Sequence, residues 1–370
     1  MARKAPRTKK PKEIHLYVGT RKGAFIFRSD LKRKNWKIEG PFFAGSEVTT
    51  ITRDPRSGNI WAAPWSAWFG PDLQVSSDRG RTWRKCLDGV SFAPERKLSL
   101  TRVWRILPDR ETRPNTLWCG ADPGALFRSD DAGKHWYEVA GLTQHPTRDK
   151  WNPGAAGMMV HALALDPWKP YRIYAGISAA GCFRSDDDGK NWKPLNTGVR
   201  ADFLPNKFPE VGQCLHSMAL SPTQPDLLFQ QNHCGVYRSK DAGATWEDIG
   251  DKKLPSRFGF AIAVDPHEVS TVYTVPEDSA ERRYVMDAKL TVYRSRNGGG
   301  KWEKLTNGLP QKNAYTQVLR HAMTTDGADK TGVYVGTTSG EIFYSRNGGD
   351  KWELMQSSFP SVVSLHAALV

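Results

Sequence analysis

Apolar and polar residues alternate in short runs along the whole chain, which is the pattern of β-strands that bury one face. Val160–Leu165 (Val-His-Ala-Leu-Ala-Leu) is one such run, and residues 172–176 form the next. No stretch of a dozen residues keeps apolar side chains at the i, i+3, i+4 spacing of a helix. The pattern therefore predicts an all-β protein.

A repeated turn separates these strands. In its clearest copy, Ser-x-Asp-x-Gly-x-x-Trp is formed by Ser185, Asp187, Gly189 and Trp192. The Asp oxygen can accept backbone N–H groups inside the turn, glycine supplies a positive φ, and serine closes the loop through its hydroxyl. We predict that these residues are structural and not catalytic. The equivalent acceptors in the six good copies are Asp78, Asp131, Asp187, Asp241, Asn297 and Asn347.

The spacing of the turns predicts the architecture. Their tryptophans stand at positions 36, 83, 136, 192, 246, 302 and 352, so each unit is 47 to 56 residues long. That is the length of a four-stranded propeller blade. The first turn, Ser29 to Trp36, is degenerate, with Leu31 and Arg33 in place of Asp and Gly. Repeats from end to end favour one closed seven-bladed β-propeller over two domains.

The two ends of the repeat array are complementary. Residues 14–19 match the second strand of later units, so the first unit lacks its innermost strand. Residues 364–369 resemble Val160–Leu165, an innermost strand with no unit of its own. We predict that the C-terminal strand completes blade 1 and removes an exposed sheet edge.

The turn resembles the Asp-box, or BNR repeat, of sialidases, sortilin-type receptors, xyloglucanases and photosystem-assembly propellers. Over residues 14–370 the chain is similar to bacterial proteins labelled glycosyl hydrolase or sialidase-like, through residues 124–129, 177–181, 200–205 and 231–233. The resemblance implies a propeller in which the box is a structural feature on the outer part of each blade. It also implies a glycan as the ligand or substrate.

Exo-sialidase activity is disfavoured. A sialidase has six blades, an arginine triad, a Tyr/Glu nucleophile pair and an Asp acid, whereas seven units are counted here and no Arg-Ile-Pro segment precedes the first. A xyloglucanase-like enzyme would pair two propellers around a cleft. If the protein is an enzyme, we expect a glycoside hydrolase with two carboxylates at the required separation. We call the face that carries the connections into the innermost strands, and those between the second and third strands, the loop face. The candidate carboxylates on it are Glu47, Asp122, Asp202, Glu210 and Glu277.

The loop face is also where a ligand is expected, because propellers carry their variable connections there. Three connections are long (residues 141–158, 193–213 and 276–289), and they carry polar and aromatic residues such as Trp151, Phe203 and Arg283. In blade 2, Trp65 and Trp68 either stack on a sugar or cover the blade top.

One repeat position of the innermost strands is rich in histidine. It is occupied by Thr49, Arg102, His161, His216, Phe260, His321 and His366. We predict a polar funnel at the channel mouth, lined by Arg102, His161, His216, Asn232, His233 and His321. The alternative is that the histidines bridge blades within the core, since His161 shares its strand face with Leu163 and Leu165.

Composition narrows the possible partners. The formal net charge is +14, and removing the six basic residues of positions 1–12 leaves +8. Residues 1–13 are predicted to be a disordered basic tail through which nucleic acid is an unlikely but open partner, and residues 14–370 the propeller. The tail has no apolar signal core and no segment is long enough to span a membrane, so we expect a cytoplasmic protein without a membrane partner.

Five cysteines without CxxC spacing predict neither a disulfide framework nor a zinc site, and no metal or cofactor is expected. Two functions remain. The first is binding, or hydrolysis, of a glycan or other small polar ligand on the loop face. The alternative is a non-enzymatic scaffold that docks or assembles a protein. Binding without catalysis is preferred, because no complete catalytic set can be named.

Overall fold

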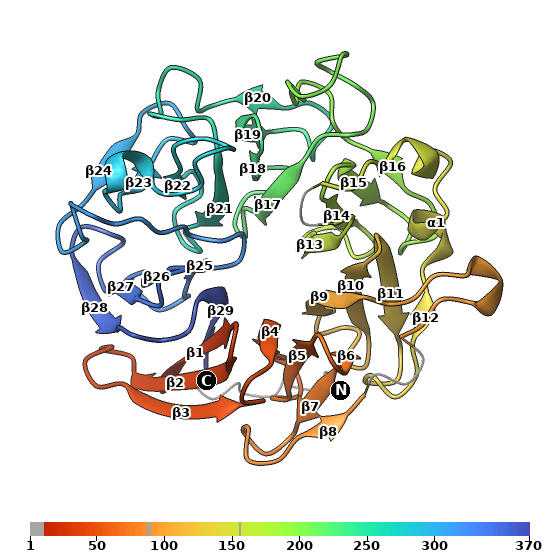
Figure 1. Ribbon diagram of the computed structural model, residues 1–370, viewed down its shortest axis with the longest axis horizontal. Coiled ribbons are helices and arrows are strands. Elements are labelled where there is room, and N and C mark those ends of the chain that lie inside the picture. Colours follow the sequence, from red (N-terminus) through yellow and green to blue (C-terminus); the bar gives the residue numbers. More distant parts are fainter. Residues whose placement is uncertain (1–10, 87–89, 155–156) are drawn as a thin grey trace, which may run out of the picture.

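The computed structural model describes residues 11–86, 90–154 and 157–370 of the chain. Its strands form seven sheets arranged in a ring around a central axis (Figure 1). Six sheets have four strands, and the second has a fifth because the short strand β6 pairs with β5. The prediction of an all-β, seven-bladed propeller is confirmed. The predicted basic tail lies outside the described residues as far as position 10, and the first strand begins at Glu13.

Each blade runs from an innermost strand beside the axis to a short outer strand at the rim. From inner to outer, blades 1 to 3 are β29 (Val362–Leu369), β1 (Glu13–Thr20), β2 (Gly23–Asp30) and β3 (Lys37–Phe42); β4 (Glu47–Arg53), β5 (Ile60–Ser66), β7 (Gln74–Ser76) and β8 (Arg84–Lys85), with β6 (Gly70–Pro71) beside β5; and β9 (Arg102–Pro108), β10 (Leu117–Asp122), β11 (Ala125–Ser129) and β12 (Tyr137–Glu138).

The remaining blades follow the same order. They are β13 (Val160–Leu165), β14 (Ile173–Ile177), β15 (Gly181–Ser185) and β16 (Lys193–Pro194); β17 (Leu215–Leu220), β18 (Leu228–Asn232), β19 (Gly235–Ser239) and β20 (Glu247–Asp248); β21 (Gly259–Val264), β22 (Val272–Pro276), β23 (Val292–Ser295) and β24 (Glu303–Leu305); and β25 (Met323–Thr325), β26 (Val333–Gly336), β27 (Ile342–Ser345) and β28 (Trp352–Gln356).

Helical structure in the described residues is confined to single turns. These are α1 (Ala140–Thr143) and the 3₁₀ turns η1 (Pro94–Arg96), η2 (Arg148–Lys150) and η3 (Met286–Ala288). Within the described ranges, no helix combines the length and the apolar character that crossing a bilayer requires.

The ring closes within blade 1. Strand β29 pairs antiparallel with β1, with Leu365 opposite Val18 and Ala368 opposite His15. The C-terminal strand therefore supplies the missing innermost strand, as the repeat alignment predicts, and it covers the backbone edge of β1 that would otherwise be exposed.

The box turns have one shared hydrogen-bond pattern. In blade 4, Ser185 Oγ donates to Asp187 Oδ1 (2.8 Å), and Oδ1 in turn accepts the backbone N–H of Asn191 (2.9 Å). The N–H of Gly189 donates to Ser185 Oγ (2.8 Å). Gly189 has φ +84°, and a Cβ there would lie 3.2 Å from Trp118 of the preceding blade. Glycine is thus needed both for the turn and for the close contact between blades.

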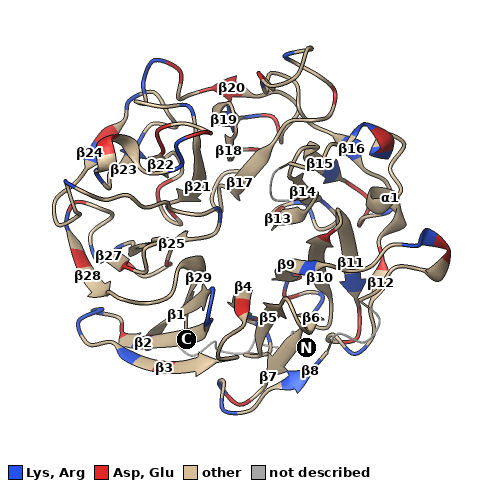
Figure 2. Ribbon diagram, viewed as in Figure 1, with Lys and Arg blue, Asp and Glu red and all other residues tan. Residues whose placement is uncertain are grey.

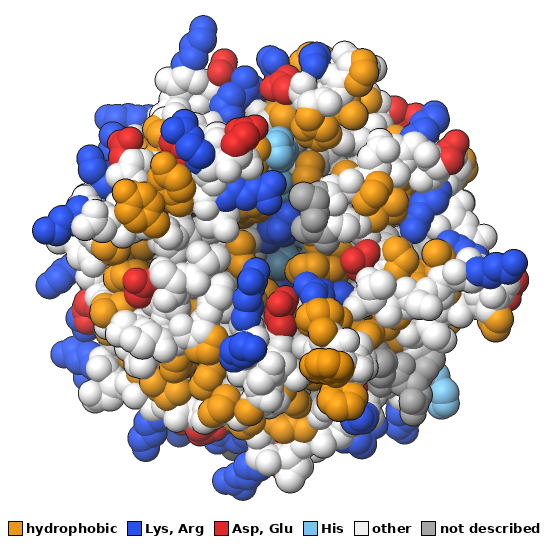
Figure 3. Space-filling view, viewed as in Figure 1, with side chains coloured by type: hydrophobic (Ala, Val, Ile, Leu, Met, Phe, Trp, Pro, Cys, Tyr) orange, Lys and Arg blue, Asp and Glu red, His pale blue; other side chains and the backbone are white. Residues whose placement is uncertain are grey.

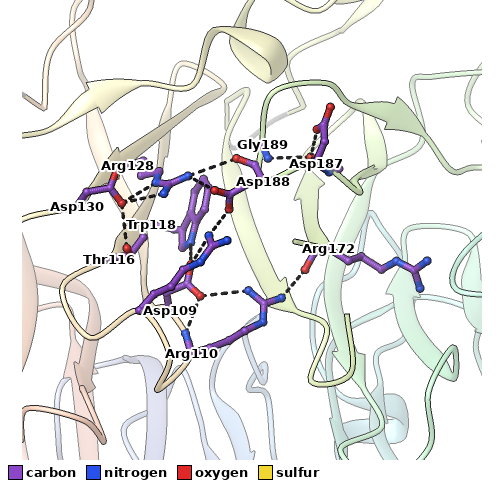
Figure 4. A network of polar contacts seen from close by, with 12 residues as sticks. Asp109, Arg110, Thr116, Trp118, Arg128, Asp130, Arg172, Asp187, Asp188 and Gly189 are labelled. Carbon is purple, nitrogen blue, oxygen red and sulfur yellow. Dashed lines mark hydrogen bonds and ion pairs between the residues drawn. The ribbon is translucent and has the colours of Figure 1, made fainter. Parts of the chain in front are cut away.

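Arginines just before the box serines tie neighbouring blades together. Arg184 Nη1 donates to the carbonyl of Ala242 in the next box (2.7 Å), and Arg238 and Arg294 repeat this contact one and two blades further on. Between blades 3 and 4, Arg128 Nη1 also reaches Asp188 Oδ2 at 2.7 Å (Figure 4). The apolar clusters likewise lie between successive blades, as where Tyr174 of blade 4 packs in one cluster with Leu228 of blade 5.

Candidate functional site

A pocket of about 280 Å³ lies beside the central axis on the loop face. Loops of blades 4 to 7 form it, and Figure 3 shows histidine and basic side chains gathered in the hollow at the centre of this face. Strands β13, β17 and β21 carry no Lys, Arg, Asp or Glu (Figure 2), so the pocket's charges come from its loops. Its polar and aromatic lining residues are Asn152, Ser178, Cys214, His216, His233, Arg283, Arg320, Phe203, Phe258 and Phe260.

His216 lies on the inner wall of this pocket, near the start of β17. Its Nδ1 is 2.6 Å from the carbonyl oxygen of Gly259 in the next blade, and its ring stacks on Phe260 with centroids 4.5 Å apart. A carbonyl oxygen only accepts, so Nδ1 carries the hydrogen and Nε2 keeps its lone pair. Burial, followed by the charge of Arg320, holds the pKa of His216 well below its usual value. The imidazole is therefore neutral at neutral pH.

His233 faces His216 from the hairpin between β18 and β19. Its ring meets Phe203 and Phe258 edge to face, with centroids 5.2 and 5.1 Å away. Burial and then the charge of Arg283 lower the pKa of His233. The aromatic contacts fix the orientation of this second imidazole, which is half-buried.

His161 and His321 contact each other outside the lining of this pocket. They come from blades 4 and 7, and their rings meet with centroids 5.7 Å apart. His161 Nε2 is 3.0 Å from the carbonyl oxygen of Leu215, in the innermost strand of blade 5. Burial and the charge of Arg320 lower the pKa of His161 to about 3. His161 and His216 thus each bond to the next blade, as the hypothesis of histidines that bridge blades expects. His216 also faces the pocket, as the hypothesis of a ligand site expects.

Of the six residues predicted to form the funnel, only His216 and His233 line the pocket, and Arg102 and Asn232 have other partners. Arg102 Nη1 is 3.2 Å from Glu47 Oε1, and its guanidinium lies over the Trp65 ring at 4.1 Å. Asn232 is fully buried, with its Oδ1 accepting the backbone N–H of Cys234 (3.4 Å) inside the hairpin. Neither side chain lines the pocket.

The candidate carboxylates are distributed over different surroundings. Glu47 pairs with Arg102, Asp202 with Arg200 (2.7 Å) and Glu210 with Lys150 (3.8 Å). Burial raises the pKa of Asp122. None of the five is among the described residues that line the pocket.

Glu277 has the most unusual environment of these carboxyl groups. It is fully buried, and its Oε2 accepts a hydrogen bond from Gln317 Nε2 (3.0 Å). Burial raises the pKa of Glu277 to about 7, because a charged carboxylate is poorly solvated there.

The pocket residues that were not recognised in the sequence include Cys214, Arg320 and Phe258. A signal existed for Cys214, because it stands two positions before His216, where a regular strand would place both side chains on one face. Arg320 directly precedes His321, but its role depends on the fold, since its charge acts on His161, His216 and His321 together.

Comparison with known proteins gives distant relatives. No family model matches the chain. It is 22% identical over 274 residues to a probable oligoxyloglucan-reducing end-specific xyloglucanase of Neosartorya fischeri, which covers 66% of this chain and 32% of that protein. It is 26% identical over 227 residues to xyloglucanase Xgh74A of Acetivibrio thermocellus, covering 54% and 25%. The chain thus spans a third or less of these relatives.

Solved structures show the same fold. An ancestral GH74 enzyme superposes with a TM-score of 0.57 at 16% identity, covering 84% of this chain and 39% of that one. YCF48 bound to a D1 peptide superposes with a TM-score of 0.52 at 14% identity, covering 95% and 85%. The protein is a seven-bladed Asp-box propeller. In sequence it is distantly related to GH74 xyloglucanases.

Proposed function

We propose that this propeller binds an anionic, hydroxyl-rich ligand of sugar size, such as a uronate-bearing glycan, in the loop-face pocket. The observation that carries the proposal is the pairing of Arg283 and Arg320 with the aromatic walls Phe203 and Phe258 around one cavity. Guanidinium groups form strong charge-assisted hydrogen bonds to a carboxylate. Aromatic faces suit the apolar face of a pyranose ring, and a volume of about 280 Å³ holds a single sugar unit.

Binding is proposed without hydrolysis. Glycosidases place two carboxyl groups beside the scissile bond, and the described lining residues of this pocket include none. The relation to xyloglucanases supports a glycan as the ligand class. Because the pocket lining is basic, the ligand expected here is an acidic glycan and not a neutral oligosaccharide.

Calorimetric titration with acidic and neutral oligosaccharides tests the proposal. We expect galacturonate or glucuronate oligomers to bind and neutral xyloglucan oligomers to bind at least about tenfold more weakly. Arg283→Ala should weaken acidic-ligand binding by about 1.5–3 kcal/mol, the range for a hydrogen bond to a charged group. The matched control is Arg282→Ala, since Arg282 is exposed and pairs with Asp278 outside the pocket. Equal affinity for the neutral oligomers, or no binding of either, would contradict the proposal.

A second function, docking of a protein, is favoured by a different observation. Trp68 and Phe69 follow each other at the β5–β6 turn and are 91% and 93% exposed. Adjacent exposed aromatic residues are frequent anchors of protein interfaces. The fold neighbour YCF48 is bound to a peptide. If docking is the function, a Trp68→Ala/Phe69→Ala double variant should lose a partner that the wild type and Arg283→Ala both retain.

A further inference from the structure

Three side chains in the pocket wall have the chemistry of a metal site. The Sγ of Cys214 and one ring nitrogen each of His216 and His233 all lie within 4.8 Å of one another. Cys214 directly precedes β17 and His216 is the second residue of that strand, and the backbone N–H of His233 donates to the carbonyl of Cys214 (2.9 Å), which ties the hairpin to this segment. The three ligand atoms thus come from two hydrogen-bonded segments of one blade.

The hydrogen bonds around His216 are those that a metal ligand needs. Its Nδ1–H donates to the Gly259 carbonyl, which directs the Nε2 lone pair away from that contact. Metal-bound histidines commonly donate their other ring nitrogen to a carbonyl or carboxylate, because this fixes the tautomer and the ring orientation. His233 is oriented instead by the rings of Phe203 and Phe258.

We propose that Cys214, His216 and His233 form a three-ligand site for a zinc-type ion, with its fourth coordination position facing the pocket. A thiolate and two imidazoles are ligands that zinc prefers. Zinc–sulfur bonds of about 2.3 Å and zinc–nitrogen bonds of about 2.0 Å place ligand atoms roughly 3.3–3.6 Å apart. Small side-chain rotations bring the cluster to that spacing. Three protein ligands and one open position are typical of zinc sites that bind a further molecule.

The surrounding charge determines what occupies that fourth position. A zinc ion with one thiolate carries a net positive charge, and Arg283 and Arg320 line the same pocket. A neutral fourth ligand would leave this positive charge uncompensated, whereas an oxyanion ligates the metal and accepts hydrogen bonds from the arginines. The metal site itself does not depend on the proposed glycan binding.

The experiment is metal titration of the reduced, untagged, full-length protein after chelator treatment. Zn²⁺ is added in competition with a chromophoric chelator, and Co²⁺ is added separately to record the near-ultraviolet band that a cobalt–thiolate bond produces. We expect one equivalent of either ion and a thiolate band with Co²⁺. Cys214→Ser should abolish the band, and Cys214→Ser and His233→Gln should each weaken Zn²⁺ binding by more than about 100-fold, beyond the effect of losing an outer-shell partner.

Cys234→Ser is the matched control, because Cys234 is a thiol of the same hairpin that lies outside the three-atom cluster. It should bind like the wild type, and circular dichroism verifies that every variant is folded. Zinc binding weaker than micromolar, an unchanged affinity in Cys214→Ser, or a cobalt spectrum without the thiolate band would each overturn the metal site. None of these results decides sugar binding, which the Arg283→Ala titration tests separately.

Discussion

Arg33 in blade 1 and Asp326 in blade 7 form a two-point ion pair across the seam of the ring. Arg33 Nε donates to Asp326 Oδ2 (2.8 Å) and Nη2 to Oδ1 (2.6 Å), and the Tyr334 hydroxyl donates to Oδ2 as well (2.6 Å). Both charged residues are almost fully buried. Arg33 occupies the glycine position of the degenerate first box, with φ +55°. The first box therefore still turns the chain, through the Arg33 N–H bond to the Asp30 carbonyl, and in addition contributes an ion pair to the last blade.

Removing the negative partner should destabilise the ring strongly. We expect Asp326→Asn to lower the free energy of unfolding by about 3–5 kcal/mol, because it leaves the Arg33 guanidinium buried without a counter-charge. Denaturant unfolding measures this, and Asp329→Asn, at an exposed neighbouring position, is the control. A loss below 1 kcal/mol would show that the pair does not hold the seam.

The buried carboxyl of Glu277 should make stability fall as pH rises. Its pKa of about 7 in the folded protein lies above the usual value of 4.5, so the unfolded chain releases this proton first. The free energy of unfolding therefore has its full value below pH 4.5, and it falls as the pH rises until the pH passes 7. We expect Glu277→Gln to remove this slope and to be more stable than wild type by about 2–3 kcal/mol at pH 8. Parallel slopes for the two proteins from pH 4.5 to 8 would contradict the burial argument.

Deleting residues 361–370 should unfold the protein cooperatively. The deletion removes β29 and exposes the edge of β1 together with apolar surface shared with blade 7. Thermal unfolding followed by circular dichroism is the measurement, and removal of residues 1–10 is the control, for which we expect no change. Unchanged melting of the C-terminal deletion would mean that the ring does not need this strand.

A box substitution should affect stability and not binding. Asp187→Ala removes the acceptor of the Ser185 hydroxyl and of the Asn191 N–H. We expect a loss of about 1–2 kcal/mol in unfolding free energy, unchanged ligand titration, and no effect of the exposed control Lys190→Ala. If the variant melts normally but no longer binds the ligand, the ligand-binding surface lies on the side of the box turns and not on the loop face.

His216→Ala should lower both the stability of the fold and the affinity for the ligand. It leaves the Gly259 carbonyl without its partner, which costs about 1–3 kcal/mol, and it removes a pocket wall. Thermal melting and titration with a galacturonate oligomer, run on the same sample, separate the two effects. If melting falls while binding is unchanged, His216 only bridges blades; if binding alone falls, the inter-blade bond is dispensable.

The fold was largely predictable because its signals are local and repeated. Ser185, Asp187 and Gly189 form their turn within five residues, so the motif is visible without knowing what packs on it. Seven copies at blade spacing give the number of sheets. The C-terminal strand was recognisable because β29 has no unit of its own while the first unit lacks a strand, and pairing the two satisfies both edges.

The pocket was not predictable in the same way. Among its residues, His216 and His233 stand out by their chemistry, but Cys214 carries no zinc-type spacing and Arg320 has no motif. Arg283 and Arg320 come from connections in different blades, and these connections do not repeat along the chain. No sequence pattern therefore indicates that the two arginines lie beside His216 and His233 of blade 5. Arg102 shares the repeat position of His216, yet Glu47 and Trp65 hold it elsewhere because each blade has different neighbours.

By itself, the sequence determined the strands, the box turns, the number of blades and the closing partner, since each depends on residues a few positions apart or on the repetition of such groups. Only the tertiary structure decided which side chains meet across blades. Arg33 and Asp326 are 293 residues apart, and Cys214 is more than 100 residues from Arg320. Their contacts exist because ring closure brings loops of different blades to one axis, and side-chain packing there depends on loop conformations that no short-range pattern encodes.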